Sequence, residues 1–156
     1  MDTVGTCHTS SSEETTAFGR LVGAWLKEKI SGVPHTSYVL LLEGELGAGK
    51  TTYTQGLASA LGITERLISP TFVFEREYPI PDSMYVLHHF DLYRKNDDMP
   101  LRTLGLTELF GNPGSIIIIE WPDKLGSMLP ESYMHITFSI KTDGSHTISW
   151  KTVGTV

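Results

Sequence analysis

Apolar residues recur at intervals of three and four near the start of the chain, the spacing of one helix face. They are Phe18, Leu21, Val22, Trp25 and Leu26. The polar run at residues 10–14, SSSEE, comes directly before them. A serine hydroxyl can cap free N–H groups there, and a glutamate favours the positive end of the helix dipole. The pattern therefore predicts a helix that starts in this run and buries the apolar face.

Two apolar runs of strand length occupy residues 38–42 (YVLLL) and 115–120 (SIIIIE). Their composition is that of strands buried on both faces. Residues 51–61 read as a helix that Gly62 stops, because glycine readily takes the left-handed conformation that ends helices. The stretch from 38 to 61 is therefore predicted to run strand, loop, helix.

The remaining patterns predict two hairpins and a short helix. Residues 71–78 and 85–91 read as strands separated by a Pro-rich turn at 79–83, and we expect them to pair antiparallel. Residues 134–140 and 145–151 flank the turn signal TDGS and should form a second hairpin. Residues 101–110 have the leucine spacing of a short amphipathic helix, which Gly111 would end.

Composition narrows the class of protein. The chain has 156 residues, 40% of them hydrophobic, which suits a single domain over residues 1–156. A net charge of −6 argues against direct binding of nucleic acid, including DNA, because phosphate contacts need a basic surface. Cys7 is the one cysteine, so no internal disulfide can form. The first residues lack the features of a secretory signal, and no apolar run is long enough for a membrane span. We therefore expect a cytoplasmic protein with no membrane partner.

The loop between the predicted strand and helix carries the clearest chemistry. Residues 44–51 read GELGAGKT, the phosphate-binding pattern G-x-x-x-x-G-K-[ST]. Its glycines let backbone N–H groups surround a phosphate, and the following helix directs its positive end at the same anion. Lys50 would reach the β and γ phosphates, and the Thr51 hydroxyl suits Mg²⁺. The predicted nucleotide-binding residues of the loop are Leu46, Gly47, Ala48, Gly49, Lys50, Thr51 and Thr52.

This loop predicts the fold class as well: α/β, a three-layer P-loop NTPase-like sandwich with a mixed parallel and antiparallel sheet. The bound nucleotide should be ATP, since a guanine site usually shows N-K-x-D and residues 94–97 read RKND. Two predicted strands end in an acid, Asp91 and Glu120. Ligands of α/β sheets gather at the carboxyl ends of strands, so both acids could face the phosphates.

Other residues near these strands have less distinctive patterns. His88 and His89 are adjacent, so in a strand they face opposite sides, and we interpret them as packing or surface residues. Trp121 is expected to be a core or lid residue. The loop SPTF, residues 69–72, could sense a γ-phosphate through Thr71.

Taken together, the motifs resemble the TsaE family, small bacterial P-loop ATPases needed for threonylcarbamoyladenosine modification of tRNA. The resemblance rests on GELGAGKTT at 44–52, SPTF at 69–72, HFDLYR at 89–94 and IEWPDK at 119–124. HFDLYR followed by IEWP is far more specific than the P-loop, which many families share. One departure lies in the last hairpin, where His146 stands near a position at which arginine is common.

The resemblance implies a function and roles for particular residues. Family members bind ATP and act with the proteins TsaB and TsaD, and hydrolysis is thought to reset that complex between turnovers. This chain would then contact tRNA only indirectly. Thr51 and Glu120 would serve Mg²⁺, and Asp91 would be the acid needed for turnover, with Glu120 and Lys50 as further catalytic residues. Thr9 and the last hairpin, near Gly144, would lie beside the base.

The division between the two acids is a further expectation. Glu120 ends the more apolar strand, which should lie beside the P-loop strand, whereas Asp91 should have a less buried setting suited to orienting water. A small-molecule P-loop kinase remains the alternative function. Such kinases often carry a lid with several arginines, and the five arginines of this chain form no cluster in sequence.

Overall fold

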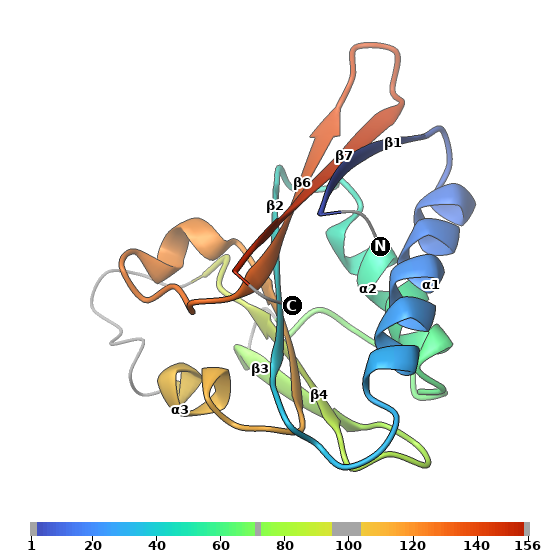
Figure 1. Cartoon of the computed structure of the whole chain (residues 1–156). Coiled ribbons are helices and arrows are strands. Elements are labelled where there is room, and N and C mark those ends of the chain that lie inside the picture. Colours follow the sequence, from blue (N-terminus) through green and yellow to red (C-terminus); the bar gives the residue numbers. More distant parts are fainter. Residues whose placement is uncertain (1–2, 71–72, 95–103, 155–156) are drawn as a thin grey trace.

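The computed structural model describes residues 3–70, 73–94 and 104–154. Its strands form one sheet in the order β1-β7-β6-β2-β5-β4-β3 (Figure 1). Their bounds are β1 Val4–Thr9, β2 Tyr38–Gly44, β3 Glu75–Pro79, β4 Val86–Asp91, β5 Ser115–Glu120, β6 Tyr133–Ile140 and β7 His146–Val153. Strands β6, β2, β5 and β4 run parallel to one another. β3 is antiparallel at one edge, and β7 is antiparallel between β6 and β1 at the other. The predicted mixed sheet and both predicted hairpins are confirmed.

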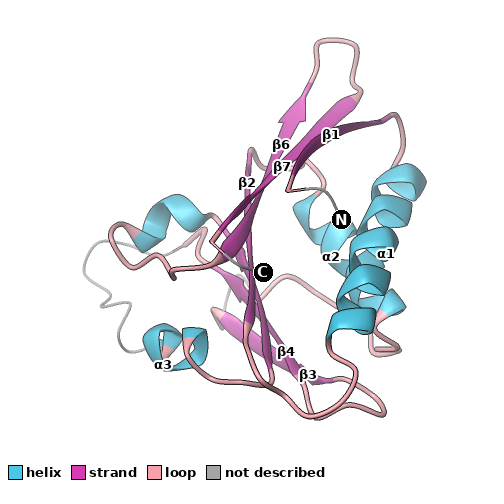
Figure 2. Ribbon diagram, viewed as in Figure 1, coloured by secondary structure: helices cyan, strands magenta, loops and turns pink. Residues whose placement is uncertain are grey.

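Helices cover the two faces of the sheet (Figure 2). α1 (Ser12–Lys29) and α2 (Lys50–Ala60) lie on one face, and α3 (Leu106–Phe110) and the 3₁₀ helix η2 (Pro122–Leu125) lie on the other. The isoleucines of β5 supply both layers: Ile116 and Ile118 pack with α1 and α2, whereas Ile117 and Ile119 pack with α3. The predicted three-layer sandwich is therefore confirmed, with two short helices as its third layer.

The first helix begins as predicted and buries most of the predicted face: Phe18, Val22 and Leu26 are buried, and Trp25 packs against the core. Ser11 is its N-cap, and the Ser11 hydroxyl accepts a hydrogen bond of 3.1 Å from the Glu14 N–H. Leu21, expected on the apolar face, is 69% exposed. The buried face also includes Gly19 and Gly23, which were not predicted and which lie directly against the backbone of α2. Small residues set the contact face because they let the two helix backbones approach closely.

Two predicted elements are shorter than expected. The strand predicted for residues 71–78 begins only at Glu75, because the N–H groups of Val73 and Phe74 both bond to the Pro70 carbonyl in a turn. Phe74 has a φ of +64°, which lies outside the β region. The helix predicted for residues 101–110 begins at Leu106, because Gly105 before it is left-handed. Residues 101–103 and Thr71, the predicted phosphate sensor, lie outside the described residues.

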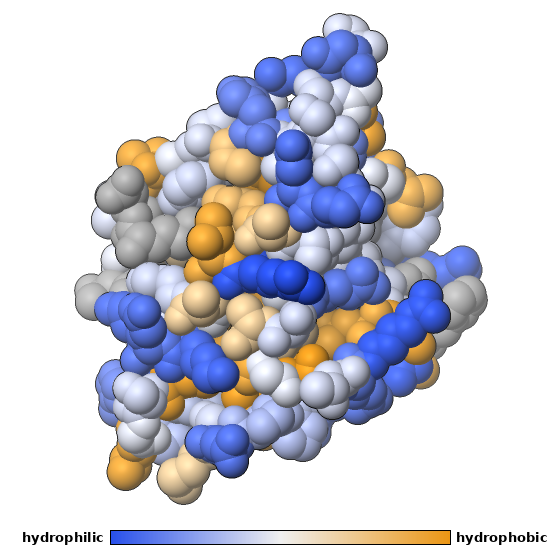
Figure 3. Space-filling model, turned by 90° about the vertical axis from the view of Figure 1, so that its right-hand side faces the viewer, coloured by the Kyte–Doolittle hydropathy of each residue, from blue (hydrophilic) through white to orange (hydrophobic). Residues whose placement is uncertain are grey.

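β1 was not predicted, since its sequence VGTCHT holds few apolar residues. It pairs with β7 along its whole length, so a neighbour far along the chain determines it. On the face that carries α1, hydrophilic and hydrophobic residues are mixed across the surface (Figure 3). The tip of the β6–β7 hairpin is hydrophilic. Within the described residues no helix combines the length and the apolar character that crossing a membrane requires.

Candidate nucleotide-binding site

The GELGAGKT loop joins β2 to α2, as the sequence predicts. Gly47 and Gly49 have φ angles of +81° and +100°, which favour glycine and curl the backbone. A Cβ added to Gly47 would meet nothing within 4 Å, so the curl opens on space. Gly49 is the N-cap of α2, and no side chain caps this helix. The free N–H groups of its first turn can therefore bind an anion.

Lys50 is the first residue of α2, directly after this loop, and is only 5% exposed. Its Nζ donates to the carbonyls of Gly44 (2.6 Å) and Glu45 (2.9 Å). The same Nζ lies 4.3 Å from the centroid of the Trp121 ring, within cation–π range. Burial lowers the pKa of Lys50, and the carboxylates of Glu120 and Asp91 oppose that shift. The ammonium thus packs over an aromatic ring and is within the electrostatic influence of two carboxylates.

Asp91 and Glu120 lie side by side, as partners in the register of the parallel strands β4 and β5. Both residues are 3% exposed. The expectation that Asp91 has a less buried setting than Glu120 is therefore wrong. Leu92 follows Asp91 into the core on the α3 side, so the chain beyond β4 stays buried for one more residue. The expectation that β5 lies beside the P-loop strand β2 is confirmed.

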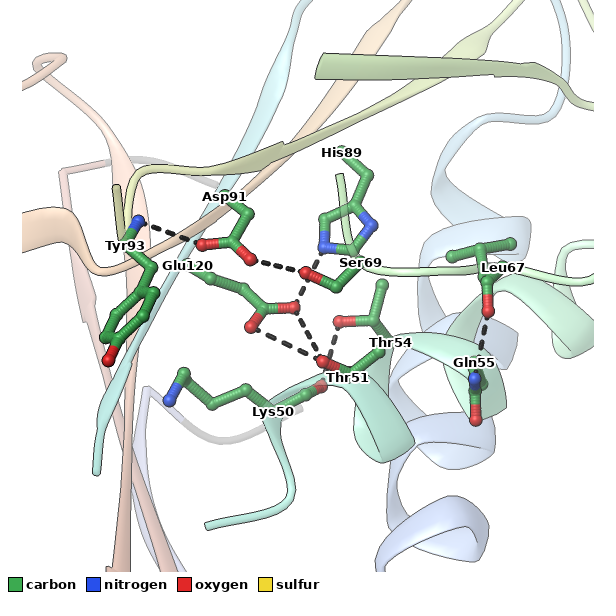
Figure 4. A network of polar contacts seen from close by, with 10 residues as sticks. All are labelled: Lys50, Thr51, Thr54, Gln55, Leu67, Ser69, His89, Asp91, Tyr93 and Glu120. Carbon is green, nitrogen blue, oxygen red and sulfur yellow. Dashed lines mark hydrogen bonds and ion pairs between the residues drawn. The ribbon is translucent and has the colours of Figure 1, made fainter. Parts of the chain in front are cut away.

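Glu120 connects the P-loop helix to the sheet (Figure 4). Its Oε1 accepts a hydrogen bond of 3.2 Å from the Thr51 hydroxyl, and its Oε2 lies 3.5 Å from the same atom. Oε1 also lies 2.9 Å from Nε2 of His89, whose ring is fully buried. The packing role expected for His89 is therefore incomplete: His89 holds a site carboxylate. The signal was its position two residues before Asp91, which puts both side chains on one face of β4.

Asp91 is held by a different set of contacts (Figure 4). Its Oδ2 accepts a short hydrogen bond from the Ser69 hydroxyl, and its Oδ1 accepts one of 2.9 Å from the Tyr93 N–H. Ser69 belongs to the SPTF segment, so Asp91 ties that loop to the end of β4. The Tyr93 ring packs against Trp121, with centroids 5.0 Å apart. Sequence reasoning did not anticipate Ser69 or Tyr93 at this site.

These residues surround a cavity of about 590 Å³. Most of the predicted site residues line it: Leu46, Gly47, Gly49, Lys50, Thr51, Thr52, Asp91 and Glu120. Four further residues of the lining were not predicted as site residues: Ser69, Tyr93, Arg94 and Trp121. Ala48 is buried, and its carbonyl lies 3.0 Å from Nδ1 of His146, which brings the last hairpin onto the loop. The site thus combines an anion-binding backbone, one lysine and two carboxylates.

Residues 9–148 match the family described as "Threonylcarbamoyl adenosine biosynthesis protein TsaE". The chain belongs to the TsaE family. Curated relatives agree. The tRNA threonylcarbamoyladenosine biosynthesis protein TsaE of Bacillus subtilis (strain 168) is 38% identical over 146 residues, covering 94% of this chain and 84% of the relative. The TsaE protein of Treponema pallidum (strain Nichols) is 33% identical over 143 residues, covering 92% and 97%.

The fold of this TsaE chain is also similar to a solved structure. The crystal structure of YdiB from Bacillus subtilis matches it with a TM-score of 0.75 at 33% identity, covering 99% of this chain and 88% of that one. The motifs that carried the resemblance come together in space. GELGAGKTT supplies the loop, SPTF the residue Ser69, HFDLYR the acid Asp91, and IEWPDK the pair Glu120 and Trp121.

A second cavity of about 300 Å³ lies on the other side of the TsaE phosphate loop. Gly47, Gly49 and Thr52 line both cavities. The remaining lining comes from the start of α1 and from the last hairpin: Ser10, Ser11, Ser12, Thr15 and His146. Thr9, expected beside the base, is 3% exposed, and its hydroxyl is 2.9 Å from that of Thr15. The N-terminal residues that line this cavity are therefore those that follow Thr9.

Proposed function

We propose that this chain binds ATP with Mg²⁺ in the 590 Å³ cavity and hydrolyses it as a cytoplasmic subunit of the machinery that makes threonylcarbamoyladenosine in tRNA. The observation that carries the proposal is the convergence of Lys50, Thr51, Asp91 and Glu120 at the open end of the phosphate loop. Family membership supports the pathway, because the matching relatives are named for threonylcarbamoyladenosine biosynthesis.

The donor set fits Mg²⁺. Thr51 Oγ1 and Glu120 Oε1 are 3.2 Å apart. Adjacent ligands of an octahedral ion with bonds of about 2.1 Å lie about 3 Å apart, so both oxygens could bind one ion with little movement. When bound, Mg²⁺ would neutralise phosphate charge, which is its usual contribution to phosphoryl transfer. His89 holds Glu120 from behind and keeps that carboxylate directed at Thr51.

Lys50 and the first turn of α2 would hold the phosphates. In the described conformation Nζ of Lys50 contacts two carbonyls of its own loop and the Trp121 ring. Phosphate oxygens would replace these partners with stronger, charge-assisted ones. Ser10, Ser11 and Thr15, in the second cavity, offer hydroxyl groups on the side of the loop where the nucleoside would lie.

The role proposed for Asp91 is to orient the attacking water. It is rigid, since both carboxylate oxygens already accept hydrogen bonds, and it lies beside Glu120 at the level of the cavity. A carboxylate so held can accept a hydrogen bond from water and direct the lone pair of the water oxygen at the γ phosphorus. ADP and inorganic phosphate would be the products.

Turnover should depend on partner proteins. Of the arginines that the structure describes, Arg94 alone lines the cavity. A kinase lid usually supplies several arginines to clamp the phosphoryl group, so this lining does not favour a kinase. The proposed partners are TsaB and TsaD, through which the chain would meet tRNA indirectly. Hydrolysis would then reset the complex after each round of modification.

Phosphate release tests the proposal. Mg-ATP should be hydrolysed slowly by the chain alone and faster once TsaB and TsaD are added, and the full set should modify tRNA over many rounds. Multi-round modification at the same rate without this chain would overturn the pathway assignment. Phosphorylation of a small alcohol or acid in place of phosphate release would establish a kinase instead.

A further inference from the structure

Three possible metal ligands lie on the opposite face of the sheet from the nucleotide cavity. Glu75 and Glu77 alternate along the edge strand β3, and His88 pairs with Glu77 on the neighbouring strand β4. The His88 side chain is on the α3 side, because Phe90, two residues further along, packs in the core cluster of that side. This cluster of Glu75, Glu77 and His88 takes no part in the proposed ATPase site.

The three side chains converge on one point. Nδ1 of His88 lies 3.0 Å from Oε1 of Glu75 and 3.6 Å from Oε1 of Glu77. One ligand atom from each residue lies within 4.8 Å of the other two. His88 is 6% exposed, so its position is fixed by packing, whereas the Glu77 side chain is 63% exposed. The site is thus anchored in the protein and open to solvent on the side of Glu77.

A hydrogen bond explains only part of this arrangement. Nδ1 carries at most one N–H, which Glu75 can accept, and Glu77 lies beyond hydrogen-bond distance. Glu77 is free to extend into water, and repulsion from Glu75 would favour that. Among the described residues, no lysine or arginine lies within 4.0 Å of either carboxylate to hold them together. A single cation among the three ligand atoms would account for the convergence.

The geometry and the ligand types favour a zinc-like ion. A tetrahedral ion with bonds of about 2.0–2.1 Å separates its ligand atoms by about 3.4 Å, and the two observed separations lie on either side of that value. Imidazole with carboxylates suits Zn²⁺, whereas Mg²⁺ prefers oxygen ligands alone. The three protein ligands would leave one position for water.

We propose that Glu75, Glu77 and His88 form a second cation site, selective for Zn²⁺ over Mg²⁺, that ties the edge strand β3 to β4. Glu75 pairs in register with Phe90, directly before Asp91, and the Asp91 N–H donates to the carbonyl of Phe74, directly before Glu75. Ion binding here would therefore stiffen the start of β3, next to the carbonyl that the Asp91 N–H contacts. The proposal does not depend on ATP hydrolysis.

Zinc titration of the metal-free chain tests the site. Isothermal calorimetry with Zn²⁺ in a buffer without chelators should find one ion per chain, and Co²⁺ in its place should give the visible absorption of a tetrahedral complex. Glu77→Gln should weaken Zn²⁺ binding roughly tenfold or more, the effect expected from losing one charge-assisted contact. Since Glu77 is exposed, this variant should fold normally. His88→Gln should weaken binding further.

A matched control exists on another part of the sheet. His135 and Glu43 also pair, at 2.7 Å, and neither belongs to the three-ligand cluster. The control variant His135→Gln should therefore bind Zn²⁺ as the wild type does. No Zn²⁺ binding by the wild type, or equal binding by Glu77→Gln, would overturn the proposal and leave a His88–Glu75 pair beside an exposed carboxylate. Loss of binding in His135→Gln alone would place the zinc elsewhere and overturn it too.

Discussion

Nε2 of His89 lies 2.9 Å from Oε1 of Glu120, and neither side chain is more than 4% exposed. The imidazole is the only described side chain, apart from Thr51, that the structure shows bonded to this carboxylate. Together with Thr51, it therefore determines where the carboxylate points. This contact places a strand residue of no predicted function behind the residue expected to bind Mg²⁺.

His89→Phe should raise the Mg²⁺ concentration needed for ATP hydrolysis roughly 10- to 100-fold, the usual cost of losing a partner that orients a metal ligand. His89→Gln, which keeps a donor near Nε2, should lose less. The Mg²⁺ dependence of the ATP-induced rise in melting temperature gives a second readout that is independent of turnover. Unchanged Mg²⁺ dependence in His89→Phe would reduce His89 to a packing residue.

The close packing of α1 on α2 gives a prediction about stability. A Cβ at Gly19 would lie 2.1 Å from the Tyr53 carbonyl oxygen, a backbone atom that cannot turn aside. Gly19→Ala should therefore destabilise the fold by about 1–3 kcal/mol through overpacking, despite the better helix propensity of alanine.

Gly111→Ala is the matched control for Gly19→Ala. Gly111 has a φ of −94°, and the nearest atom to its Cβ would be 3.9 Å away. Urea unfolding of both variants should show a loss for Gly19→Ala and almost none for Gly111→Ala. Equal midpoints would mean that the helices can separate at little cost.

The elements that the sequence predicted best are those with local signals. The isoleucine run of β5 and the glycine-rich loop each fix their own structure, and the order of the motifs along the chain is enough to indicate the family. Elements that depend on distant partners were missed or misjudged. β1 has a weak pattern and exists because β7 pairs with it. Leu21 fits the helical spacing, but the contact face is turned toward Gly19 and Gly23, since close backbone approach outweighs hydrophobicity there.

At the site, too, the residues with local sequence signals could be predicted, whereas the contacts between distant residues could not. Lys50, Thr51 and the two acids could be placed from motif and strand ends alone. The contacts that position them, from His89 to Glu120 and from Ser69 to Asp91, join residues 31 and 22 positions apart. No periodicity relates such residues, and for His89 and Glu120 it is the register of β4 on β5 that brings them together.

Trp121 should report nucleotide binding. Lys50 Nζ lies over its ring, and phosphate would draw that ammonium away. Tryptophan emission should therefore change when Mg-ATP is added, and less so with GTP, given the absence of a guanine motif. Lys50→Ala should remove both the emission change and the rise in melting temperature, because it deletes the charge that faces the phosphates.

Two variants identify the tryptophan that responds. The chain also contains Trp25 and Trp150. Trp25→Phe should keep the emission change and Trp121→Phe should lose it. A response that survives in Trp121→Phe would come from Trp25 or Trp150 and would contradict the assignment of the signal to Trp121.

Substitutions of Asp91 and of Glu120 should impair ATP hydrolysis in different ways, although the two residues are equally buried and adjacent. Glu120 bonds to Thr51, so Glu120→Ala should raise the Mg²⁺ requirement. Asp91 instead accepts hydrogen bonds from the Ser69 hydroxyl and the Tyr93 N–H. Asp91→Ala should therefore leave ATP binding nearly intact and slow hydrolysis, the signature of an interaction made mainly in the transition state.

With TsaB and TsaD present, tight ATP binding without turnover in Asp91→Ala should limit tRNA modification to one round. Asp91→Asn, which keeps the shape and one acceptor, should retain the Ser69 loop while still slowing hydrolysis, and this separates the water-orienting role from the structural one. Hydrolysis at the wild-type rate in Asp91→Ala would leave Asp91 as a structural anchor for the Ser69 loop.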